Sequence, residues 1–305
     1  MEQEFHHWLK TRNAAPKSTA ASILLGIGDD AAIVRGSTDS LVVATDTIAE
    51  GTHFELEKHS LSLIGRKSLA VNLSDLAAMA ARPVAAVLTF LLPKQFDLDH
   101  AKQIYLGIEQ LANEFELTIV GGDTNTWNGP LVVGATVLGR IDPGHAPWRM
   151  DGVNPGDGIV VSGSFGGSIH GHHLTFTPRL KLAHYLAENY AIDAATDVSD
   201  SLSLDLDGMA RSSGLGIDLN PNAIPISDAV RDASPTQALQ HALTDGEDFE
   251  LILAVNPLGV QNLLNDPNVP GILTLIGTAT DVHTGLRTKQ ADGSWTRLTP
   301  RGYIH

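Results

Sequence analysis

Apolar and polar residues alternate in blocks along the first half of the chain, and these blocks predict both strands and helices. The segment LVVATDT (Leu41–Thr47) is apolar and β-branched and ends in polar residues, which is typical of a strand. Leu61–Ala81 is rich in Leu and Ala and is followed by Pro83, which predicts a helix that ends before the proline. By the same criteria we expect helices at 2–10 and 100–115, strands at 84–92 and 131–139, and a short buried strand at 117–120 that runs into Gly-Gly-Asp-Thr.

The second half repeats this mixture after residues 142–155, where prolines and glycines interrupt the periodicity. We place a boundary there, between an N-terminal domain (1–143) and a C-terminal domain (144–305). A helix is predicted at 200–213, with Leu202, Leu206, Met209 and Ser213 along one side. Further helices are expected at 179–190, 227–232, 235–243 and 258–264, and strands at 158–162, 215–219, 249–255 and 272–278. The predicted fold class is therefore α/β (α+β) with two domains.

Composition narrows the classes of function. The 305-residue chain has 35 Asp and Glu against 20 Lys and Arg, a formal net charge of -15. Nucleic-acid binding needs basic surfaces, so we expect no nucleic-acid partner. A phosphorylated small molecule remains compatible with this charge if metal ions neutralise it.

The chain contains no cysteine, which excludes disulfides, thiolate zinc sites and a cysteine nucleophile. Its first residues, MEQEFHHWLK, lack the basic and apolar regions of a signal peptide. No apolar run approaches the roughly 20 residues of a membrane-spanning helix. We therefore expect a cytoplasmic protein with no membrane partner.

Aspartates recur in small clusters beside Gly or Ser and next to apolar segments such as LVVATDT, LAVNLSDLAAMA and LTIVGGDT. A carboxylate beside a buried segment costs free energy unless it is paired or binds a metal. Two like charges about 4 Å apart repel by roughly 4 kcal/mol at an effective dielectric of 20, and hard divalent cations relieve such repulsion. The cluster residues are Asp29, Asp30, Asp46, Asp75, Asp123, Asp197 and Asp200.

Magnesium suits these clusters better than zinc because it prefers oxygen ligands and usually binds together with substrate phosphates. Some of the acids also have a structural interpretation. Asp29 fits a turn, Asp123 fits an Asx turn, and Asp200 fits the N-terminus of a helix. Asp75 lies inside a predicted helix, where such a role is harder to assign. Taken together, the acids favour a site for metal ions and phosphate.

Known nucleotide-binding signatures are missing from the sequence, which has no GxxxxGK[ST] loop and no kinase HRD or DFG motif. An ATP site would need a different element to bind the phosphates. The pair Gly121-Gly122 would let backbone amides approach phosphate oxygens, although such pairs are usually turns. The HGHH run (His170–His173) invites a zinc interpretation, but no cysteine or spaced fourth ligand accompanies it.

Eight motifs occur in order over residues 24–255: GIGDDAA, ATDTIAEGTHF, NLSDLAAMAARP, GGDT, SGSFGGS, TPR, DVSDSLSLDL and DGEDFEL. The series resembles the thiamine-monophosphate kinases, within the superfamily of aminoimidazole ribotide synthetase and selenophosphate synthetase. The resemblance implies an N-terminal domain that pairs across a homodimer into a barrel-like sheet, and a C-terminal α/β layer that completes the substrate site. It also implies ATP-dependent phosphorylation of thiamine monophosphate to the diphosphate, with several Mg²⁺ ions.

The resemblance also assigns roles to residues. His53 and Glu247 are the expected substrate contacts. The acceptor is already an ionised phosphate, so we expect no single catalytic base. Arg149 has the alternative of an ordinary loop arginine. The expected ATP contacts are Gly122, Asp123, Arg149 and Ser199. The expected metal ligands are Asp30, Ala44 (through its backbone), Thr45, Asp46, Asp75, Asp123, Asp197 and Asp200.

The chain departs from the family pattern in its C-terminal half. Ser201 and Asp245 stand where glycines are usual, and segment 170–177 replaces a longer helix. Pro300 stands where relatives carry an aromatic that stacks on the thiamine ring, with Tyr303 nearby. Two alternatives stay open: another ATP-dependent enzyme of this superfamily with a different phosphorylated acceptor, and a non-catalytic nucleotide- and Mg-binding protein. The complete aspartate set argues against the second.

Overall fold

The computed structural model describes residues 23–25, 29, 31–35, 40–290 and 292–303. The chain divides into two compact units, one up to Gly144 and the other from His145 onward, with Ala77–Ala80 grouped with the second. The helix predicted at 2–10 and the predicted metal ligand Asp30 lie outside the described residues. No helix in the described ranges is long and apolar enough to cross a membrane.

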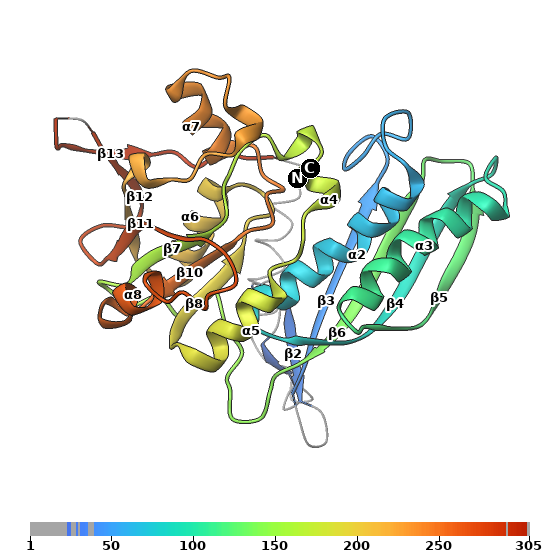
Figure 1. Cartoon of the computed structure of the whole chain (residues 1–305), viewed down its shortest axis with the longest axis horizontal. Coiled ribbons are helices and arrows are strands. Elements are labelled where there is room, and N and C mark those ends of the chain that lie inside the picture. Colours follow the sequence, from blue (N-terminus) through green and yellow to red (C-terminus); the bar gives the residue numbers. More distant parts are fainter. Residues whose placement is uncertain (1–22, 26–28, 30, 36–39, 291, 304–305) are drawn as a thin grey trace. The chain divides into compact units, whose positions relative to one another are not determined.

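The N-terminal unit is a six-stranded sheet with helices α2 (Leu61–Ala78) and α3 (Leu98–Glu114) along one face (Figure 1). The strands lie in the order β1-β2-β3-β6-β4-β5, and only the β4–β5 pairing is parallel among the described strands of this sheet. Residues on β3 alternate as expected, with Val42 and Ala44 buried and Thr45 and Thr47 exposed. The strands are β1 Ile23–Leu25, β2 Ala32–Arg35, β3 Ser40–Ala49, β4 Arg82–Pro93, β5 Thr118–Trp127 and β6 Val132–Arg140.

Glycines bring the two helices of this unit into backbone contact. A Cβ atom on Gly65 of α2 would lie 2.0 Å from the carbonyl oxygen of Ile104, and one on Gly107 of α3 would lie 1.9 Å from that of Ser62. Only glycine permits such an approach. The two helices therefore form a closely packed layer against the sheet.

Strand β5 differs from the prediction of a short buried strand at 117–120. It continues through Asp123 to Trp127, and its residues are mostly exposed. Within the described residues β5 pairs only with β4, where Asp123 lies opposite Thr89. The apolar run LTIV suggested burial. Leu117 is buried, but Thr118 and Val120 are exposed and Ile119 is only partly buried, so the predicted burial was wrong for most of the segment.

The C-terminal unit is a seven-stranded mixed sheet in the order β13-β12-β9-β11-β7-β10-β8. Its strands are β7 Gly158–Ser162, β8 Ile192–Asp197, β9 Gly216–Leu219, β10 Leu251–Val255, β11 Leu273–Thr280, β12 Gly285–Lys289 and β13 Trp295–Leu298. Its α-helices are α4 His172–Thr175, α5 Leu180–Asn189, α6 Leu202–Ser212, α7 Pro235–Thr244 and α8 Pro257–Leu264. Short 3₁₀ helices are η2 Ser168–His170, η3 Pro221–Ala223 and η4 Asp228–Val230.

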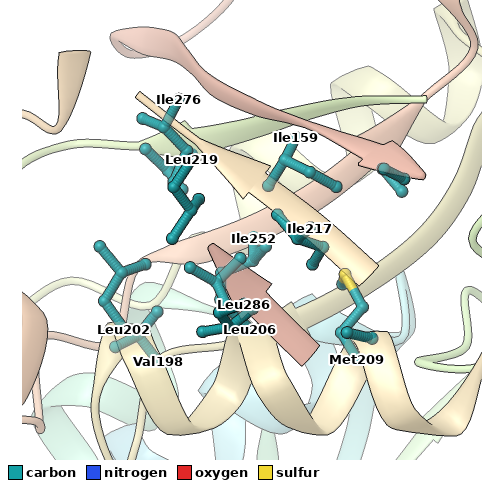
Figure 2. Close-up of a cluster of buried hydrophobic side chains, with 14 of the residues drawn as sticks. Ile159, Val198, Leu202, Leu206, Met209, Ile217, Leu219, Ile252, Ile276 and Leu286 are labelled. Carbon is teal, nitrogen blue, oxygen red and sulfur yellow. The ribbon is translucent and has the colours of Figure 1, made fainter. Parts of the chain in front are cut away.

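Helix α6 packs its apolar side onto this sheet. Leu202, Leu206 and Met209 are fully buried, as their spacing predicted, and they face Ile217 and Ile252 of the sheet (Figure 2). Burying one such side chain contributes about 1.5–3 kcal/mol. The helix begins at Leu202 rather than at 200, because Ser201 caps it by accepting a hydrogen bond from the Leu204 amide at 3.1 Å.

Other boundaries follow local backbone chemistry. Strand β7 spans the predicted range 158–162. Strand β10 begins at Leu251 instead of 249, because Glu247 and Phe249 adopt left-handed φ angles of 53° and 50° that no strand accommodates.

Strands β12 and β13 were not predicted, since polar and charged residues obscure their alternation.

The predicted mixed class of strands and helices is confirmed, with two sheets of different order. Neither sheet closes on itself within the described residues, so the barrel-like pairing across a dimer stays a prediction.

One carboxylate fastens the end of helix α5 to the loop after α8. Asp266 accepts hydrogen bonds from the hydroxyls of Tyr185 at 2.5 Å and Tyr190 at 2.7 Å. The hydrogen bond from Tyr185, followed by those from Asn268 and Tyr190, lowers the pKa of Asp266 to about 2. A carboxylate with a lowered pKa in the folded chain stabilises the fold above its unfolded pKa, and this stabilisation is lost as the pH falls.

We therefore expect Asp266→Ala to lower the Tm at pH 7. The Tm difference from the unmodified chain should shrink below pH ~4, the unfolded value, as the pH falls toward about 2. Thermal melts followed by circular dichroism over this range measure it. A difference that stays constant down to the lowest pH would contradict the role of the charged carboxylate.

Candidate functional site

Helix α2 and strand β3 bring two of the predicted metal ligands onto neighbouring elements. The Asp46 amide donates to Asn72 Oδ1 of α2 at 3.0 Å. Asp75 follows Asn72 by three residues, so it lies on the same side of the helix. Ala44 and Thr45 precede Asp46 on the strand, and Thr45 Oγ1 donates to the Ala135 carbonyl at 3.1 Å.

His53 is held at the end of this strand by hydrogen bonds. Its Nδ1 accepts from the Ala49 amide at 3.1 Å, and its own amide donates to the Ala49 carbonyl at 2.9 Å. Its carbonyl accepts from Lys67 Nζ at 2.9 Å. Lys67 is fully buried in α2. Our sequence reasoning missed Lys67 and Asn72, although polar residues inside an apolar helix were a usable signal.

A pocket of about 440 Å³ lies beside β5 on the N-terminal unit. Its lining combines the backbone of Gly121 and Gly122 with two aromatic rings, Phe90 of β4 and Tyr105 of α3. Such a lining suits a flat base with a phosphate tail, because aromatic faces stack on bases and glycine amides approach phosphate oxygens. Sequence reasoning missed Tyr105 because its place in the pocket depends on how α3 packs. The remaining lining residues are Leu88, Ile119, Val120, Asp123 and Thr124.

The sheet does not bring Asp123 to Asp46. Three strand-to-strand steps of about 4.8 Å separate β3 from β5, so the two Cα atoms lie roughly 14 Å apart. Asp123 instead accepts a hydrogen bond from Asn125 Nδ2 at 2.6 Å. One metal ion cannot reach both carboxylates of the same chain across that distance.

The C-terminal unit gathers its own predicted residues around one loop, Asp197–Ser201, between β8 and α6. The Glu247 amide donates to the Ser199 carbonyl at 2.8 Å, so the predicted substrate contact and the predicted ATP contact are neighbours. The Tyr303 amide donates to the Asp200 carbonyl at 3.1 Å. The C-terminal segment thus lies against the loop that carries Asp197, Ser199 and Asp200.

Negative charge is concentrated at this loop. Asp205 of α6 accepts hydrogen bonds from the Ser199 and Ser201 amides, both at 3.1 Å. Burial raises the pKa of Asp205 well above its usual range, and the charges of Asp200 and Asp197 raise it further. Carboxylates grouped in this way favour the binding of a cation from solution.

Arg149 lies next to β8, where its carbonyl accepts from the Ala195 amide at 3.1 Å. Its guanidinium forms a bidentate pair with Asp151, at 2.9 and 2.6 Å. Both side chains are 42 % exposed, so the pair is a weak one that a phosphate could replace.

Within the described residues, no group of three or more His, Asp or Glu side chains is arranged to hold a metal ion. Of the predicted ligands, Asp46 and Asp75 lie on neighbouring elements of the N-terminal unit, Asp123 lies on β5 of the same unit, and Asp197 and Asp200 lie on one loop of the C-terminal unit. The HGHH run also does not form a zinc site among these residues. His173 is buried, with its Nδ1 2.9 Å from the Ser168 carbonyl, and His172 Nε2 lies 3.2 Å from the Asp248 carbonyl.

Comparison with known proteins identifies the family. The profile of "AIR synthase related protein, N-terminal domain" matches residues 28–141. The thiamine-monophosphate kinase of Rhodopirellula baltica is 39 % identical over 100 % of this chain and 97 % of its own length. The solved thiamine-monophosphate kinase of Stenotrophomonas maltophilia K279a is 32 % identical, with a TM-score of 0.73 over 94 % of this chain and 95 % of that one. A ThiL protein complexed with AMPPCP and TMP has the same fold, with 22 % identity and a TM-score of 0.81 over 97 % of this chain and 94 % of that one. The resemblance carried by the ordered motifs is confirmed, and this chain belongs to the thiamine-monophosphate kinase family.

Proposed function

We propose that this protein transfers the terminal phosphoryl group of ATP to the phosphate of thiamine monophosphate, which gives thiamine diphosphate. The observation that carries the proposal is the pocket beside Gly121-Gly122, with Tyr105 and Phe90 in its lining, in a chain of this family. The AMPPCP and TMP bound by the ThiL protein of the same fold agree with this pair of substrates.

Magnesium ions fit the carboxylates that this chain presents. The donors are oxygen atoms without thiolates, and Asp197 and Asp200 lie on one loop beside Asp205, whose pKa is raised first by burial and then by their charges. Bound magnesium would neutralise the phosphates of both substrates. The proposed ligands are Asp30, Ala44 (carbonyl), Thr45, Asp46, Asp75, Asp123, Asp197 and Asp200.

The chain's own residues bind and orient the two substrates. We assign thiamine monophosphate to His53 and Glu247. The proposed ATP contacts are the Gly122 amide, Asp123, Arg149 and Ser199. Phosphoryl transfer depends mainly on positioning and charge stabilisation, and the acceptor phosphate is already ionised. No residue needs to remove a proton, so no catalytic base is assigned.

A homodimer would make use of strand β5. Among the described strands, the outer edge of β5 has no neighbour, and Val120 on this strand is 61 % exposed. Such an edge is usually covered in native proteins. Light scattering after size-exclusion chromatography tests this; a monomer at micromolar concentration would contradict it.

Purified protein incubated with ATP, Mg²⁺ and thiamine monophosphate tests the function. Thiamine diphosphate, followed by fluorescence after oxidation, should exceed the amount of enzyme. ATP consumption only with another phosphorylated acceptor would favour a different enzyme of the superfamily. Nucleotide binding without consumption would favour a non-catalytic protein.

Tyr105→Ala is expected to raise the KM for ATP by about five- to 100-fold, because stacking of a base on an aromatic ring is worth about 1–3 kcal/mol. Tyr105→Phe keeps the ring and should stay close to the unmodified chain. Leu106→Ala is the matched control, since the neighbouring Leu106 is exposed and does not line the pocket. Steady-state kinetics with varied ATP measure the effect. An unchanged KM for ATP in Tyr105→Ala would contradict the assignment of the ATP base to this pocket.

Tyr303 is the better candidate than Pro300 for the aromatic that stacks on the thiamine ring. Its amide is bonded to Asp200, and its side chain is 39 % exposed. We expect Tyr303→Ala to raise the KM for thiamine monophosphate by about tenfold and to leave the KM for ATP unchanged. Pro300→Ala serves as the control. A larger effect of Pro300→Ala would reverse the assignment.

A further inference from the structure

The glycine-rich loop after β7, Ser162–Ser168, is fastened to the segment Asp245–Glu250, which we call the acidic segment. The Gly167 amide donates to Asp245 Oδ2 at 2.7 Å, and the Gly166 amide donates to Asp248 Oδ1 at 3.0 Å. Carboxylates of the chain itself thus occupy the two amides that a phosphate would otherwise use. The loop serves as an anchor for the acidic segment.

The acidic segment is backbone-strained where it carries the proposed substrate contact. Glu247 and Phe249 have φ angles of 53° and 50°, and Gly246 between Asp245 and Glu247 has a φ of 74°. A residue other than glycine in this conformation costs about 1–3 kcal/mol unless its surroundings hold it. The amides of Glu247 and Phe249 donate to the carbonyls of Ser199 and Val198 at 2.8 and 2.9 Å, which secures one side of the segment.

Asp248 lies between the two strained residues and secures the other side. Its side chain is 2 % exposed, and its Oδ1 accepts from Gly166 while its Oδ2 is buried with no hydrogen-bond partner in the described part of the chain. Burial raises the pKa of Asp248 to about 8, and the charges of Asp245, Glu250 and Glu247 act in the same direction against the Gly166 hydrogen bond. The side chain is therefore mainly neutral at pH 7 and adds little repulsion to Glu247.

We propose that Asp248 is a positioning residue for Glu247: its bond to Gly166 fixes the acidic segment between the glycine loop and the loop 197–201, so that Glu247 stays in its left-handed conformation. This inference rests on the proposed function, in which Glu247 contacts thiamine monophosphate. Asp248 is itself too buried to touch the substrate.

Amide hydrogen exchange of the full chain tests the positioning without any assay of activity. In Asp248→Ala, the amides of Glu247 and Phe249 should exchange about tenfold faster or more, because the segment loses the anchor that lies between these two residues and keeps only the Asp245–Gly167 bond on that side. Asp248→Asn keeps an acceptor for Gly166 and should restore slow exchange. Asp193→Ala is the matched control, since Asp193 also has a buried oxygen without a partner among the described residues but lies on β8. Unchanged exchange at Glu247 and Phe249 in Asp248→Ala would overturn the proposal.

Kinetics then connect the positioning to the substrate. Asp248→Ala should raise the KM for thiamine monophosphate by about tenfold with the KM for ATP unchanged, and Asp248→Asn should reverse most of this. Combined with Glu247→Ala, Asp248→Ala should add nothing, because it acts through Glu247. Additive effects of the two changes would overturn the proposal. If the unmodified chain fails to phosphorylate thiamine monophosphate, the proposed function is wrong, and the exchange experiment still decides whether Asp248 positions Glu247.

Discussion

Replacing Glu250 by alanine is expected to lower the free energy of unfolding by about 3–5 kcal/mol, the range for removing one partner of a buried ion pair. Glu250 is 2 % exposed and binds the Arg179 guanidinium through both carboxylate oxygens, with the Arg179 Nε bond at 2.6 Å. It also accepts from Ser162 Oγ, whose oxygen in turn accepts from the Leu251 amide. Burial acts to lower the pKa of Arg179, but the hydrogen bond and charge of Glu250 outweigh it and the pKa is raised.

We attribute the large loss to the unpaired charge of Arg179, and a double variant tests this attribution. Arg179→Met combined with Glu250→Leu removes both charges and should recover most of the stability, because an apolar pair often replaces a buried ion pair at little cost. Urea unfolding of the single and double variants measures the two free energies. If the double variant is as unstable as Glu250→Ala, the loss reflects packing rather than the unpaired Arg179.

The glycine beside this pair gives an independent check. A Cβ on Gly163, at φ +58°, would lie 2.0 Å from Glu250 Oε1, which Arg179 holds in place. Gly163→Ala should therefore destabilise the chain by more than the ~1–2 kcal/mol of a left-handed backbone alone. Gly214→Ala is the matched control, because Gly214 has a similar φ of +70° and no atom within 4 Å of the added Cβ. Equal losses in the two variants would contradict a clash with Glu250.

Local patterns predicted those parts of the fold in which one segment decides its own structure. The helix around Asp75 needs only its Leu- and Ala-rich sequence, and it forms as α2 with Asp75 inside it. The strand at 158–162 and the apolar side of α6 were predicted for the same reason. Their hydrophobic periodicity matches a buried face, and no distant residue has to be known.

Features that depend on neighbours distant in sequence were not predictable in this way. Whether LTIV forms an inner strand or an edge strand depends on the sheet order, which placed β5 at the rim. The left-handed angles of Glu247 and Phe249 depend on the carbonyls of Ser199 and Val198, some 50 residues earlier in the chain. Tyr105 reaches the pocket only because α3 packs beside β4 and β5. Contacts between segments that are distant in the chain cannot be predicted from the local patterns of a single sequence.

The spacing of Asp46 and Asp123 adds a constraint to the prediction that the aspartates share one site. Within one chain, Asp46 is bonded through its amide to α2, and Asp123 lies roughly 14 Å from Asp46 across the sheet. We therefore expect Asp123 and Asp46 of one chain to bind different metal ions. A variant of Asp75 tests metal binding directly.

Asp75→Asn is expected to lower kcat by about 10³-fold or more, because a metal ligand supplies several kcal/mol of charge stabilisation to the transferring phosphoryl group. Without metal, the variant should be as stable as the unmodified chain or more stable, since it removes one negative charge from a chain whose formal net charge is -15. Raising the Mg²⁺ concentration should restore part of the activity. Asp99→Asn, on the exposed side of α3 and paired only weakly with Lys102 at 3.3 Å, is the control for the chemical change itself. Calorimetric melts with EDTA and assays over a Mg²⁺ series measure both quantities, and a large fall of Tm in the metal-free variant would assign Asp75 to the fold instead of the metal.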